Sequence, residues 1–337
     1  MEFMDNFWRE KNVLVTGATG FLGYWLTKAL VQERANVVTL VRDHDPQSAL
    51  IRSGLIQKTR VVQGALEDYA SLERAINEHE IDTVFHLGAQ TIVGTALRNP
   101  LSTFESNIRG TYNLLEACRQ HKTLVQRIVV ASSDKAYGSS LILPYTEEMP
   151  LRGQHPYDVS KSCTDLISHA YHHTYGLPIV IARCGNLYGG GDLNWSRLVP
   201  GTIKNFHSKA APVIRSDGTF TRDYLYVEDA VNAYLVLAFN ANKENIRGQA
   251  FNFGPNKPYS VLEIVHALQR LMDCTDLAPQ VLNVAKEEIR DQSLDSKKAH
   301  KILGWQPLFT LEEGLRRSIE WYTNYFVETL TEDHCCL

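Results

Sequence analysis

The sequence lacks both a long apolar run and a strong excess of charge of one sign. Its 337 residues carry 34 Lys and Arg against 38 Asp and Glu, a net charge of −4, so we expect neither nucleic acid nor a membrane as a partner. No apolar run approaches the roughly 20 residues that a membrane span needs. The first residues, MEFMDNFWREK, are acidic and mixed, and we therefore expect no signal peptide.

Cysteine is scarce, and its spacing provides no metal or redox motif. None of the six cysteines forms a CxxC pair, which favours a reducing, cytoplasmic location. The C-terminal HCCL has His334 where a prenylation motif needs Cys, so residues 331–337 are predicted to be a flexible tail. The histidines of HAYHH (169–173) have no carboxylate or cysteine partner pattern, and no bound metal is expected.

The first half of the chain alternates between strand-like and helix-like segments. Short apolar runs such as NVLVTG, ANVVTLVR, DTVFHLG and QRIVVASS are separated by helical patterns such as FLGYWLTKALVQE and TFESNIRGTYNLLEACRQH. This alternation predicts parallel strands with right-handed crossovers covered on both faces. The predicted fold class is therefore α/β, a Rossmann-type doubly wound sheet with a smaller C-terminal lobe.

The alternation ends near residue 180, where Gly-rich loops, short strands and further helices follow. We predict a dinucleotide-binding domain over residues 1–180, with part of 226–255 returning to it. Residues 181–330 are predicted to form mainly a substrate-binding lobe. Internal repeats, low-complexity tracts and linkers are not evident, so the two parts should pack directly on each other.

A glycine-rich loop, VTGATGFLG, stands between the first strand and the first helix. Gly17 permits the tight turn, Gly20 lets the backbone approach a pyrophosphate, and Gly23 allows close packing of helix and strand. The helix N-terminus then offers free N–H groups to the phosphates. This context predicts a dinucleotide site that also includes Thr19, Phe21 and Leu22.

The residues after the second strand leave the choice between NAD and NADP open. Asp43 has the spacing of the acid that holds the ribose 2′-hydroxyl of NAD. Arg42 precedes it, and an arginine there suits the 2′-phosphate of NADP, unless it is simply a solvated charge. We favour NADP slightly, with the cofactor tightly bound.

A second cluster of polar residues suggests proton-transfer chemistry. Tyr157 and Lys161 lie four residues apart in PYDVSK, which places both on one face of a predicted helix. A lysine ammonium beside a phenol lowers the pKa of that phenol, and Tyr157 would then accept a proton from a sugar hydroxyl. Ser133, at the end of the strand RIVVA, is expected to hydrogen-bond the same oxygen.

With these motifs the chain resembles the extended short-chain dehydrogenases/reductases that act on nucleotide sugars. TGATGFLG, VFHLGAQ, SNIRGTYNLLEA, PYDVSK, RDYLYVEDAV, FNFG and LGWQP fit the pattern of that family over roughly residues 10–325. FHLGAQTIVGTALRNP, SSDKAYG, GNLYGGGDLNWSRLVP and FNFGPN are most similar to the nucleotide-sugar 4,6-dehydratases of the CDP-glucose type. The resemblance implies a lyase that removes water from a nucleotide hexose, with CDP-glucose as the first-choice substrate.

The resemblance also assigns roles to the two residues after Ser133. Epimerases of the superfamily usually have small, inert residues there, whereas dehydratases have an acid and a second proton-transfer group. Asp134 is thus the expected acid at the C6 hydroxyl, and Lys135 the expected base or enolate stabiliser at C5. A surface ion pair between the two is the structural alternative.

Other contacts are implied by position in the family pattern. Leu87, Gly88 and Ala89 are expected to line the cofactor, and Leu66 to lie near its adenine, although Ala65 replaces an acid found in relatives. Gln90 is expected near the sugar. Asn186 and Arg222 are candidate diphosphate ligands, and Arg197 and Arg290 are candidates that a solvated surface charge would explain equally well. Asn107 is expected to make a structural hydrogen bond.

Three functional alternatives remain open. A C4 epimerase or a decarboxylase of the same superfamily would share the cofactor loop, and a non-catalytic nucleotide-binding protein would share only that loop.

Two predicted helices indicate a homodimer. They are TFESNIRGTYNLLEACRQ and YDVSKSCTDLISHAYHHTYG, which resemble the helices that form a four-helix dimer interface in the family.

Overall fold

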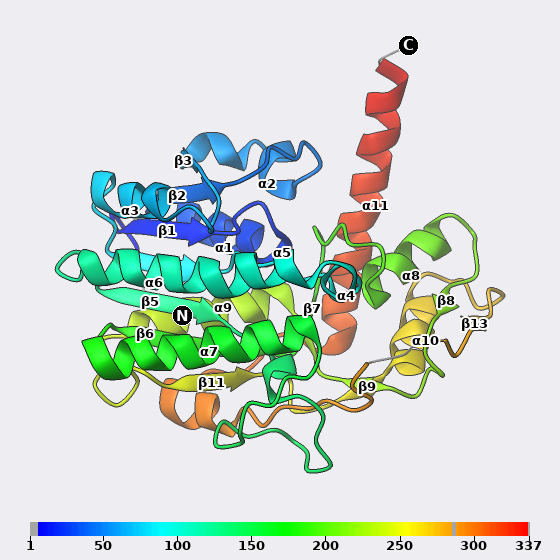
Figure 1. Cartoon of the computed structure of the whole chain (residues 1–337). Coiled ribbons are helices and arrows are strands. Elements are labelled where there is room, and N and C mark those ends of the chain that lie inside the picture. Colours follow the sequence, from blue (N-terminus) through cyan, green and yellow to red (C-terminus); the bar gives the residue numbers. More distant parts are fainter. Residues whose placement is uncertain (1–5, 285–287, 336–337) are drawn as a thin grey trace.

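The computed structural model describes residues 6–284 and 288–335 and contains a seven-stranded parallel sheet between two layers of helices (Figure 1). The strand order is β11-β6-β5-β4-β1-β2-β3, and all neighbours pair in parallel. The chain order therefore reverses between β1 and β4, which is the point where such sheets bind ligands. The predicted doubly wound Rossmann-type fold is confirmed.

The sheet strands are β1 (Asn12–Thr16), β2 (Asn36–Val41), β3 (Arg60–Gln63), β4 (Thr83–His86), β5 (Arg127–Ala131), β6 (Ile179–Cys184) and β11 (Ala250–Phe253). The helices are α1 (Phe21–Gln32), α2 (Ala49–Arg52), α3 (Tyr69–Glu78), α4 (Val93–Arg98), α5 (Pro100–Phe104), α6 (Gly110–Gln120), α7 (Pro156–Tyr175), α8 (Leu198–His207), α9 (Val227–Asn240), α10 (Val261–Leu271) and α11 (Leu311–Cys335). Short strands outside the main sheet are β7 (Asn186–Tyr188), β8 (Val213–Ile214), β9 (Thr221–Arg222), β10 (Tyr224–Tyr226), β12 (Tyr259–Ser260) and β13 (Gln280–Val281).

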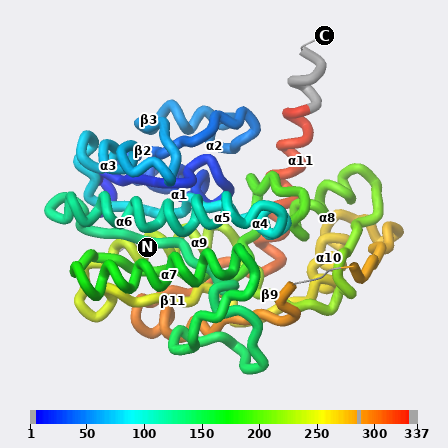
Figure 2. The backbone as a smooth tube through the Cα atoms, in the orientation of Figure 1, coloured from blue at the N-terminus to red at the C-terminus, as the bar shows by residue number. Residues whose placement is uncertain are grey.

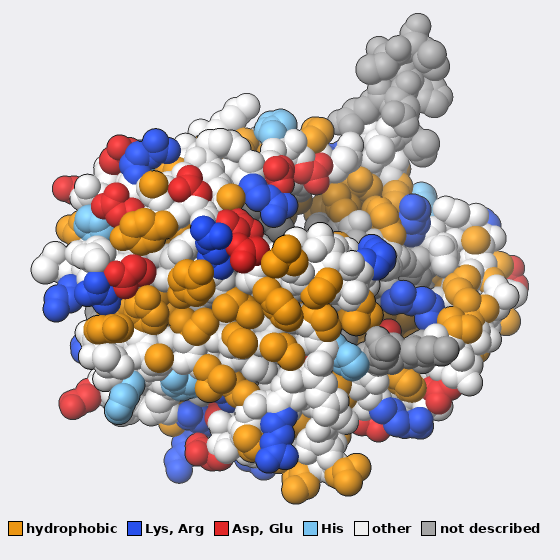
Figure 3. Space-filling view, viewed as in Figure 1, with side chains coloured by type: hydrophobic (Ala, Val, Ile, Leu, Met, Phe, Trp, Pro, Cys, Tyr) orange, Lys and Arg blue, Asp and Glu red, His pale blue; other side chains and the backbone are white. Residues whose placement is uncertain are grey.

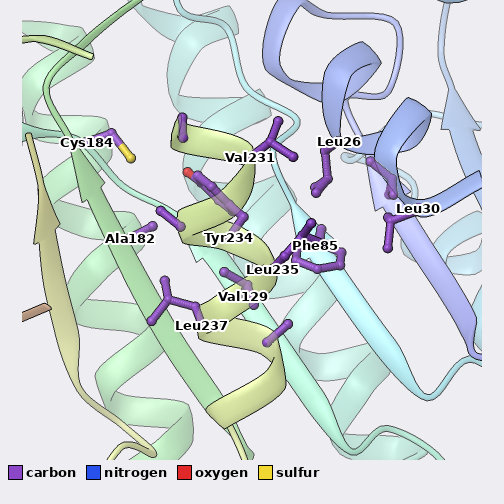
Figure 4. Packing of buried hydrophobic residues seen from close by; sticks show 14 of the residues in the cluster. Leu26, Leu30, Phe85, Val129, Ala182, Cys184, Val231, Tyr234, Leu235 and Leu237 are labelled. Carbon is purple, nitrogen blue, oxygen red and sulfur yellow. The ribbon is translucent and has the colours of Figure 1, made fainter. Parts of the chain in front are cut away.

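The strands are apolar on both faces because helices cover both. Val13 and Val15 of β1 belong to the same buried cluster as residues of α1 and α9, whereas Leu14 belongs to the opposite cluster, with residues of α3 and α6. Figure 4 shows the first cluster, in which Tyr234 and Leu235 of α9 lie over the sheet near Phe85. Continuous apolar strands are the expected pattern for a sheet buried on two sides.

The two parts of the molecule exchange segments along the chain. After β6 the backbone enters the second lobe, returns as α9 and β11 to the sheet, and leaves again for α10 (Figure 2). A separate buried cluster, which includes Ile203, Phe206, Ile264 and Leu268, forms the core of that lobe. The division at residues 180 and 330 remains a prediction, and α11 continues through the beginning of the predicted tail.

One predicted helix has a different structure. Residues 103–121 were expected to be one continuous helix, but α5 ends at Phe104 and α6 begins at Gly110, with a π-helical turn over Glu105–Arg109 between them. The turn buries Asn107, whose side chain bonds the backbone of Gln90 at 2.7 and 3.0 Å and Ser160 at 2.9 Å. Such turns often accompany functional sites, and this one fixes the loop after β4.

No helix in residues 6–284 and 288–335 is long and apolar enough to cross a lipid bilayer.

Candidate active site

A cavity of about 1180 Å³ lies at the carboxyl ends of the parallel strands. Its walls include Gly17 after β1, Leu87 after β4 and Ser133 after β5, together with Trp195 and Phe220 of the second lobe. Single-ligand pockets usually measure about 300–1,000 Å³, so this cavity has room for two ligands. The predicted site residues that line it are Gly17, Thr19, Gly20, Phe21, Leu22, Gly23, Arg42, Asp43, Leu66, Leu87, Gly88, Ala89, Ser133, Lys135, Tyr157, Lys161, Asn186, Arg197 and Arg222.

The glycine loop forms a cradle that larger residues would fill. Gly17 has φ +73°, and a Cβ atom there would lie 2.7 Å from the backbone nitrogen of Gly88. A Cβ atom at Gly23 would lie 2.0 Å from the carbonyl oxygen of Gly17. The loop therefore brings the N-terminus of α1 close to the strand ends, and the residues present fit the pyrophosphate of a dinucleotide.

Ser133, Tyr157 and Lys161 are brought together as predicted, but the pKa of the phenol differs from expectation. Burial raises the pKa of Tyr157 to about 12, against the lowering effects of Arg197 and of a hydrogen bond with Ser133. Lys161 was expected to lower it. Burial instead lowers the pKa of Lys161 to about 8, and its Nζ donates to the carbonyl oxygen of Ala131 at 2.8 Å.

Asp134 and Lys135 begin a 3-10 turn, Asp134–Tyr137, directly after Ser133. Asp134 is only 1% exposed, which excludes a surface ion pair, and its Oδ1 accepts a hydrogen bond from Ser133 Oγ at 2.9 Å. Its Oδ2 is buried without a hydrogen-bond partner among the described residues. Burial raises the pKa of Asp134 and lowers that of Lys135, so both groups are shifted toward their neutral forms.

Arg42 and Asp43 pair with each other at the end of β2. Arg42 Nε lies 2.6 Å from Asp43 Oδ2, and both side chains are largely exposed. Gln63 Nε2 donates to the carbonyl oxygen of Arg42 at 2.6 Å, which fixes the backbone at this point. The acid and the arginine that the sequence predicts for ribose recognition thus share one corner of the cavity.

The predicted substrate ligands have different surroundings. Arg197 Nη1 lies 2.9 Å from Asp192 Oδ2, and Asn186 is a neighbouring part of the wall. Arg222 is buried and its guanidinium donates to backbone carbonyl oxygens, including that of Arg290 at 2.7 Å. Arg222 therefore stabilises the backbone of the loop that contains Arg290.

Two predicted substrate residues lie elsewhere. Arg290 is exposed, with its guanidinium 3.6 Å from carboxylate oxygens of Asp217 and of Asp291. Gln90 uses its side chain locally, because Oε1 accepts from the backbone of Ile92 at 2.5 Å and Nε2 donates to Thr103 Oγ1 at 3.1 Å. These contacts support the surface-charge interpretation of Arg290 and place Gln90 in a loop-stabilising role.

Two features of the site were not predicted. Lys135 Nζ donates to Gln292 Oε1 at 3.1 Å; the two residues are 157 positions apart, and no sequence pattern connects them. On the buried side of α7, Asp165 forms a bidentate pair with Arg183 of β6, both bonds measuring 2.8 Å. The spacing of Asp165, four residues after Lys161, would have indicated that both share one face of α7.

Comparisons with known proteins agree with this geometry. The family model described as GDP-mannose 4,6 dehydratase matches residues 14–318. CDP-glucose 4,6-dehydratase of Salmonella typhimurium is 30% identical, over 94% of this chain and 92% of the relative. dTDP-glucose 4,6-dehydratase of Haemophilus influenzae is 32% identical, over 92% of this chain and 97% of the relative.

Solved structures extend the similarity to proteins that hold the expected ligands. dTDP-glucose 4,6-dehydratase of Bacillus anthracis in complex with NAD has a TM-score of 0.82 and 26% identity, covering 93% of this chain and 97% of that one. UDP-glucuronic acid 4-epimerase of Bacillus cereus in complex with UDP-glucuronic acid and NAD has a TM-score of 0.84 and 27% identity, covering 93% and 99%. The chain belongs to the nucleotide-sugar 4,6-dehydratase family of extended short-chain dehydrogenases/reductases, whose members are NAD(P)-dependent enzymes.

Proposed function

We propose that the chain converts CDP-glucose into CDP-4-keto-6-deoxyglucose and water. The observation that carries the proposal is the position of Lys135, which lines the cavity together with Ser133 and Tyr157, and of the buried Asp134, which lies between Ser133 and Lys135 in the chain, directly behind this part of the wall. Water loss from a sugar needs an acid and a base in addition to the group that assists oxidation. The similarity to the CDP-glucose enzyme supports the choice of nucleotide, and dTDP-glucose is the competing substrate because its enzymes are equally similar.

The glycine loop and the walls around Leu66, Leu87 and Ala89 would hold the dinucleotide. When bound, the cofactor would supply reversible hydride transfer with the sugar, and its positively charged oxidised form would favour the phenolate of Tyr157 against the effect of burial.

Tyr157 serves as the base that takes the proton of the C4 hydroxyl. Ser133, which lowers the pKa of Tyr157, would hydrogen-bond the phenol oxygen and so orient it toward the sugar. Lys161 keeps α7 in register with β5 through its bond to Ala131. These three residues account for oxidation at C4, which makes the C5 proton acidic.

Asp134 and Lys135 then perform the elimination. Lys135 Nζ, in its neutral form, takes the C5 proton, and the electron pair of the C5–H bond becomes the C5–C6 double bond as the C6–O bond breaks. The departing hydroxyl takes the carboxyl proton of Asp134 and leaves as water. The raised pKa of Asp134 and the lowered pKa of Lys135 suit these directions of proton transfer.

For the substrate diphosphate we propose Asn186 and Arg197, which line the cavity. An arginine fork matches phosphate oxygens in geometry and charge. Arg222 also lines the cavity, but its N–H groups already bond backbone carbonyls, so we expect it to contribute mainly its positive charge.

For the cofactor we propose NADP rather than NAD. Asp43 is paired with Arg42 at 2.6 Å, so its carboxylate is neutralised where it would otherwise repel a 2′-phosphate. The guanidinium of Arg42 is exposed and can bond that phosphate. The test is a binding titration of the apoprotein: Arg42→Ala should weaken NADP binding at least 10-fold and leave NAD binding nearly unchanged. Equal loss for both cofactors would contradict the preference.

We further propose that two chains associate through α6 and α7. Figure 3 shows hydrophobic side chains gathered over the face that these helices form. Tyr112, Leu166 and Tyr175 on this face are 41%, 58% and 51% exposed, and Leu101 of α5 is 69% exposed. A contiguous apolar patch on the surface of a folded chain usually marks an interface, and two copies would bury it symmetrically.

The experiment for the reaction is an incubation of the purified protein with CDP-, dTDP-, UDP- and GDP-glucose, followed by mass spectrometry. We expect CDP-glucose to lose the mass of one water. Loss of water from dTDP-glucose alone would correct the nucleotide but keep the reaction. An unchanged mass with a new sugar stereochemistry would instead identify a C4 epimerase, the activity of the Bacillus cereus protein.

A further inference from the structure

We propose that Gln292 is a positioning residue that holds the amine of Lys135 toward the sugar, an inference that rests on the proposed role of Lys135 at C5. Gln292 is fully buried, and its Oε1 accepts a hydrogen bond from Lys135 Nζ at 3.1 Å. Its Nε2 is buried without a hydrogen-bond partner among the described residues. An unsatisfied buried amide costs free energy, so an apolar side chain would serve a purely structural role better.

The backbone of Gln292 is fixed from both sides. On one side, its N–H donates to the carbonyl oxygen of Thr221 at 3.1 Å, and Arg222 donates to the carbonyl oxygen of Arg290 at 2.7 Å. On the other, Tyr145 N–H donates to the carbonyl oxygen of Ser293 at 2.7 Å. The amide group of Gln292 is thus presented to Lys135 by a segment that has little freedom to move.

Asp223 anchors the same segment two residues later, at Leu294. Its Oδ2 accepts from the backbone N–H of Leu294 at 2.5 Å, and the carboxyl is completely buried. The adjacent residues Arg222 and Asp223 therefore both hold residues 289–294 in place, which explains why the guanidinium of Arg222 bonds backbone carbonyls although the residue lines the cavity.

The neutral charge of Gln292 is important for its effect on Lys135. The charged groups that face the amine are Asp134 in its own turn, Asp158 of α7, Arg222 of β9 and Glu288 in the neighbouring loop. Burial and Arg222 lower the pKa of Lys135, whereas the three carboxylates raise it. An amide oxygen holds the amine in place without adding a fourth negative charge that would keep it protonated.

The test measures single-turnover water loss from CDP-glucose, or from the nucleotide glucose that the panel identifies, between pH 6 and pH 10. We expect the rate of the wild-type enzyme to rise with pH as Lys135 loses its proton. In Gln292→Glu, a carboxylate beside Nζ raises the pKa of Lys135, so the rising limb moves to higher pH by about 1–3 units. In Gln292→Met, the rising part of the rate–pH curve moves to lower pH, because the protonated amine has lost a hydrogen-bond acceptor. The maximal rate of water loss at high pH falls at least 10-fold, because nothing holds the amine toward the sugar.

Deuterium from D₂O at C5 of the product provides a second measurement, because the proton taken by Lys135 exchanges with solvent. We expect the rate of deuterium incorporation to depend on pH in the same way as the rate of water loss, in the wild type and in each variant. Gln292→Asn withdraws the amide by one methylene, and it should lower the plateau even if the other two variants fail to fold. Asn240→Leu, which removes a buried amide that donates to the Val236 carbonyl oxygen within α9, controls for general destabilisation and should leave the rising part of the rate–pH curve in place.

If folded Gln292 variants have the same pH dependence and the same maximal rate of water loss as the wild type, the proposal is wrong. Lys135→Met separates this outcome from a failure of the proposed function. If Lys135→Met keeps full water loss, the role of Lys135 at C5 is wrong, whatever the Gln292 variants do. If Lys135→Met loses water loss while the Gln292 variants behave as the wild type, only the positioning role is wrong.

Discussion

At the scale of single residues, the buried carboxyl of Asp134 distinguishes this site from that of a simple dehydrogenase. In the proposed mechanism Ser133, Tyr157 and Lys161 account for oxidation at C4, and the glycine loop would hold the dinucleotide. Asp134 adds a group whose pKa is raised by burial, and this shift favours the protonated carboxyl that the proposed proton transfer to a departing hydroxyl requires.

Asp134→Asn should therefore separate the two halves of the reaction. We expect C4 oxidation to remain visible as transient reduced cofactor in stopped-flow absorbance, while water loss falls roughly 100-fold or more, the range of general acid catalysis. Asp276→Asn, an exposed substitution, is the control. Full turnover of Asp134→Asn would show that another group protonates the C6 hydroxyl.

The Asp165–Arg183 pair makes a prediction about stability and pH. Burial alone would raise the pKa of Asp165, but hydrogen bonds from Arg183 and His169 lower it to about 2. Because this is below the unfolded value of about 3.9, the stabilising contribution is complete above about pH 4 and is lost as the pH falls toward 2.

Asp165→Asn should lower the free energy of unfolding by about 3–5 kcal/mol at pH 7, because it leaves the Arg183 guanidinium buried without its partner. Urea denaturation at pH 7 and pH 3 measures this, and the difference from the wild type should shrink at the lower pH. A difference that is small at pH 7, or that does not depend on pH, would contradict the assignment.

The sequence was sufficient for residues whose signal is local, and insufficient for contacts between distant segments. Ser133, Tyr157 and Lys161 could be found because short spacings place them at strand ends or on one helix face. Gln292 could not, because its contact with Lys135 depends on how residues 289–294 are held by Arg222 and Asp223.

At the scale of elements, the close approach of β1, α1 and β4 forms the cradle in which we expect the cofactor to bind. Gly23→Ala should disrupt it, since the added Cβ would lie 2.0 Å from the carbonyl oxygen of Gly17. We expect a lower melting temperature and at least a 10-fold loss of dinucleotide affinity, measured by thermal unfolding and calorimetric titration.

Gly176→Asn is the matched control. Gly176 has φ +70° and open space around it at the end of α7, and asparagine tolerates that conformation better than most residues. Cofactor affinity should remain at the wild-type value in this variant. Normal binding in Gly23→Ala would show that the loop can shift without losing its cradle.

Elements with strong periodicity were predicted well, and the exceptions have physical causes. β1, α1, β4 and β5 agree with their apolar patterns within a few residues. The break between α5 and α6 was missed because a π-helical turn preserves helical composition while changing which side chains face the protein. The turn buries Asn107, and the structural role of this residue follows from its hydrogen bonds to Gln90 and Ser160.

At the scale of the whole molecule, the exposed apolar face of α6 and α7 is the surface on which we propose that a second copy of the chain packs. Leu166→Glu places a charge in the middle of it and should convert a dimer into a monomer in size-exclusion chromatography with light scattering, because burying an unpaired carboxylate is costly. Leu141→Glu, on a fully exposed loop, should remain dimeric. A dimer that survives Leu166→Glu would place the interface elsewhere.

The most direct test of the account traces the hydrogen on C4. CDP-glucose deuterated at C4 is incubated with the enzyme, or dTDP-glucose if the panel selects it, and the product is examined by NMR spectroscopy. We predict a 4-keto sugar with the deuterium in the methyl group at C6 and the mass of one water missing. Deuterium retained at C4 of a sugar of unchanged composition would show that Asp134 and Lys135 do not perform an elimination, and would contradict the account.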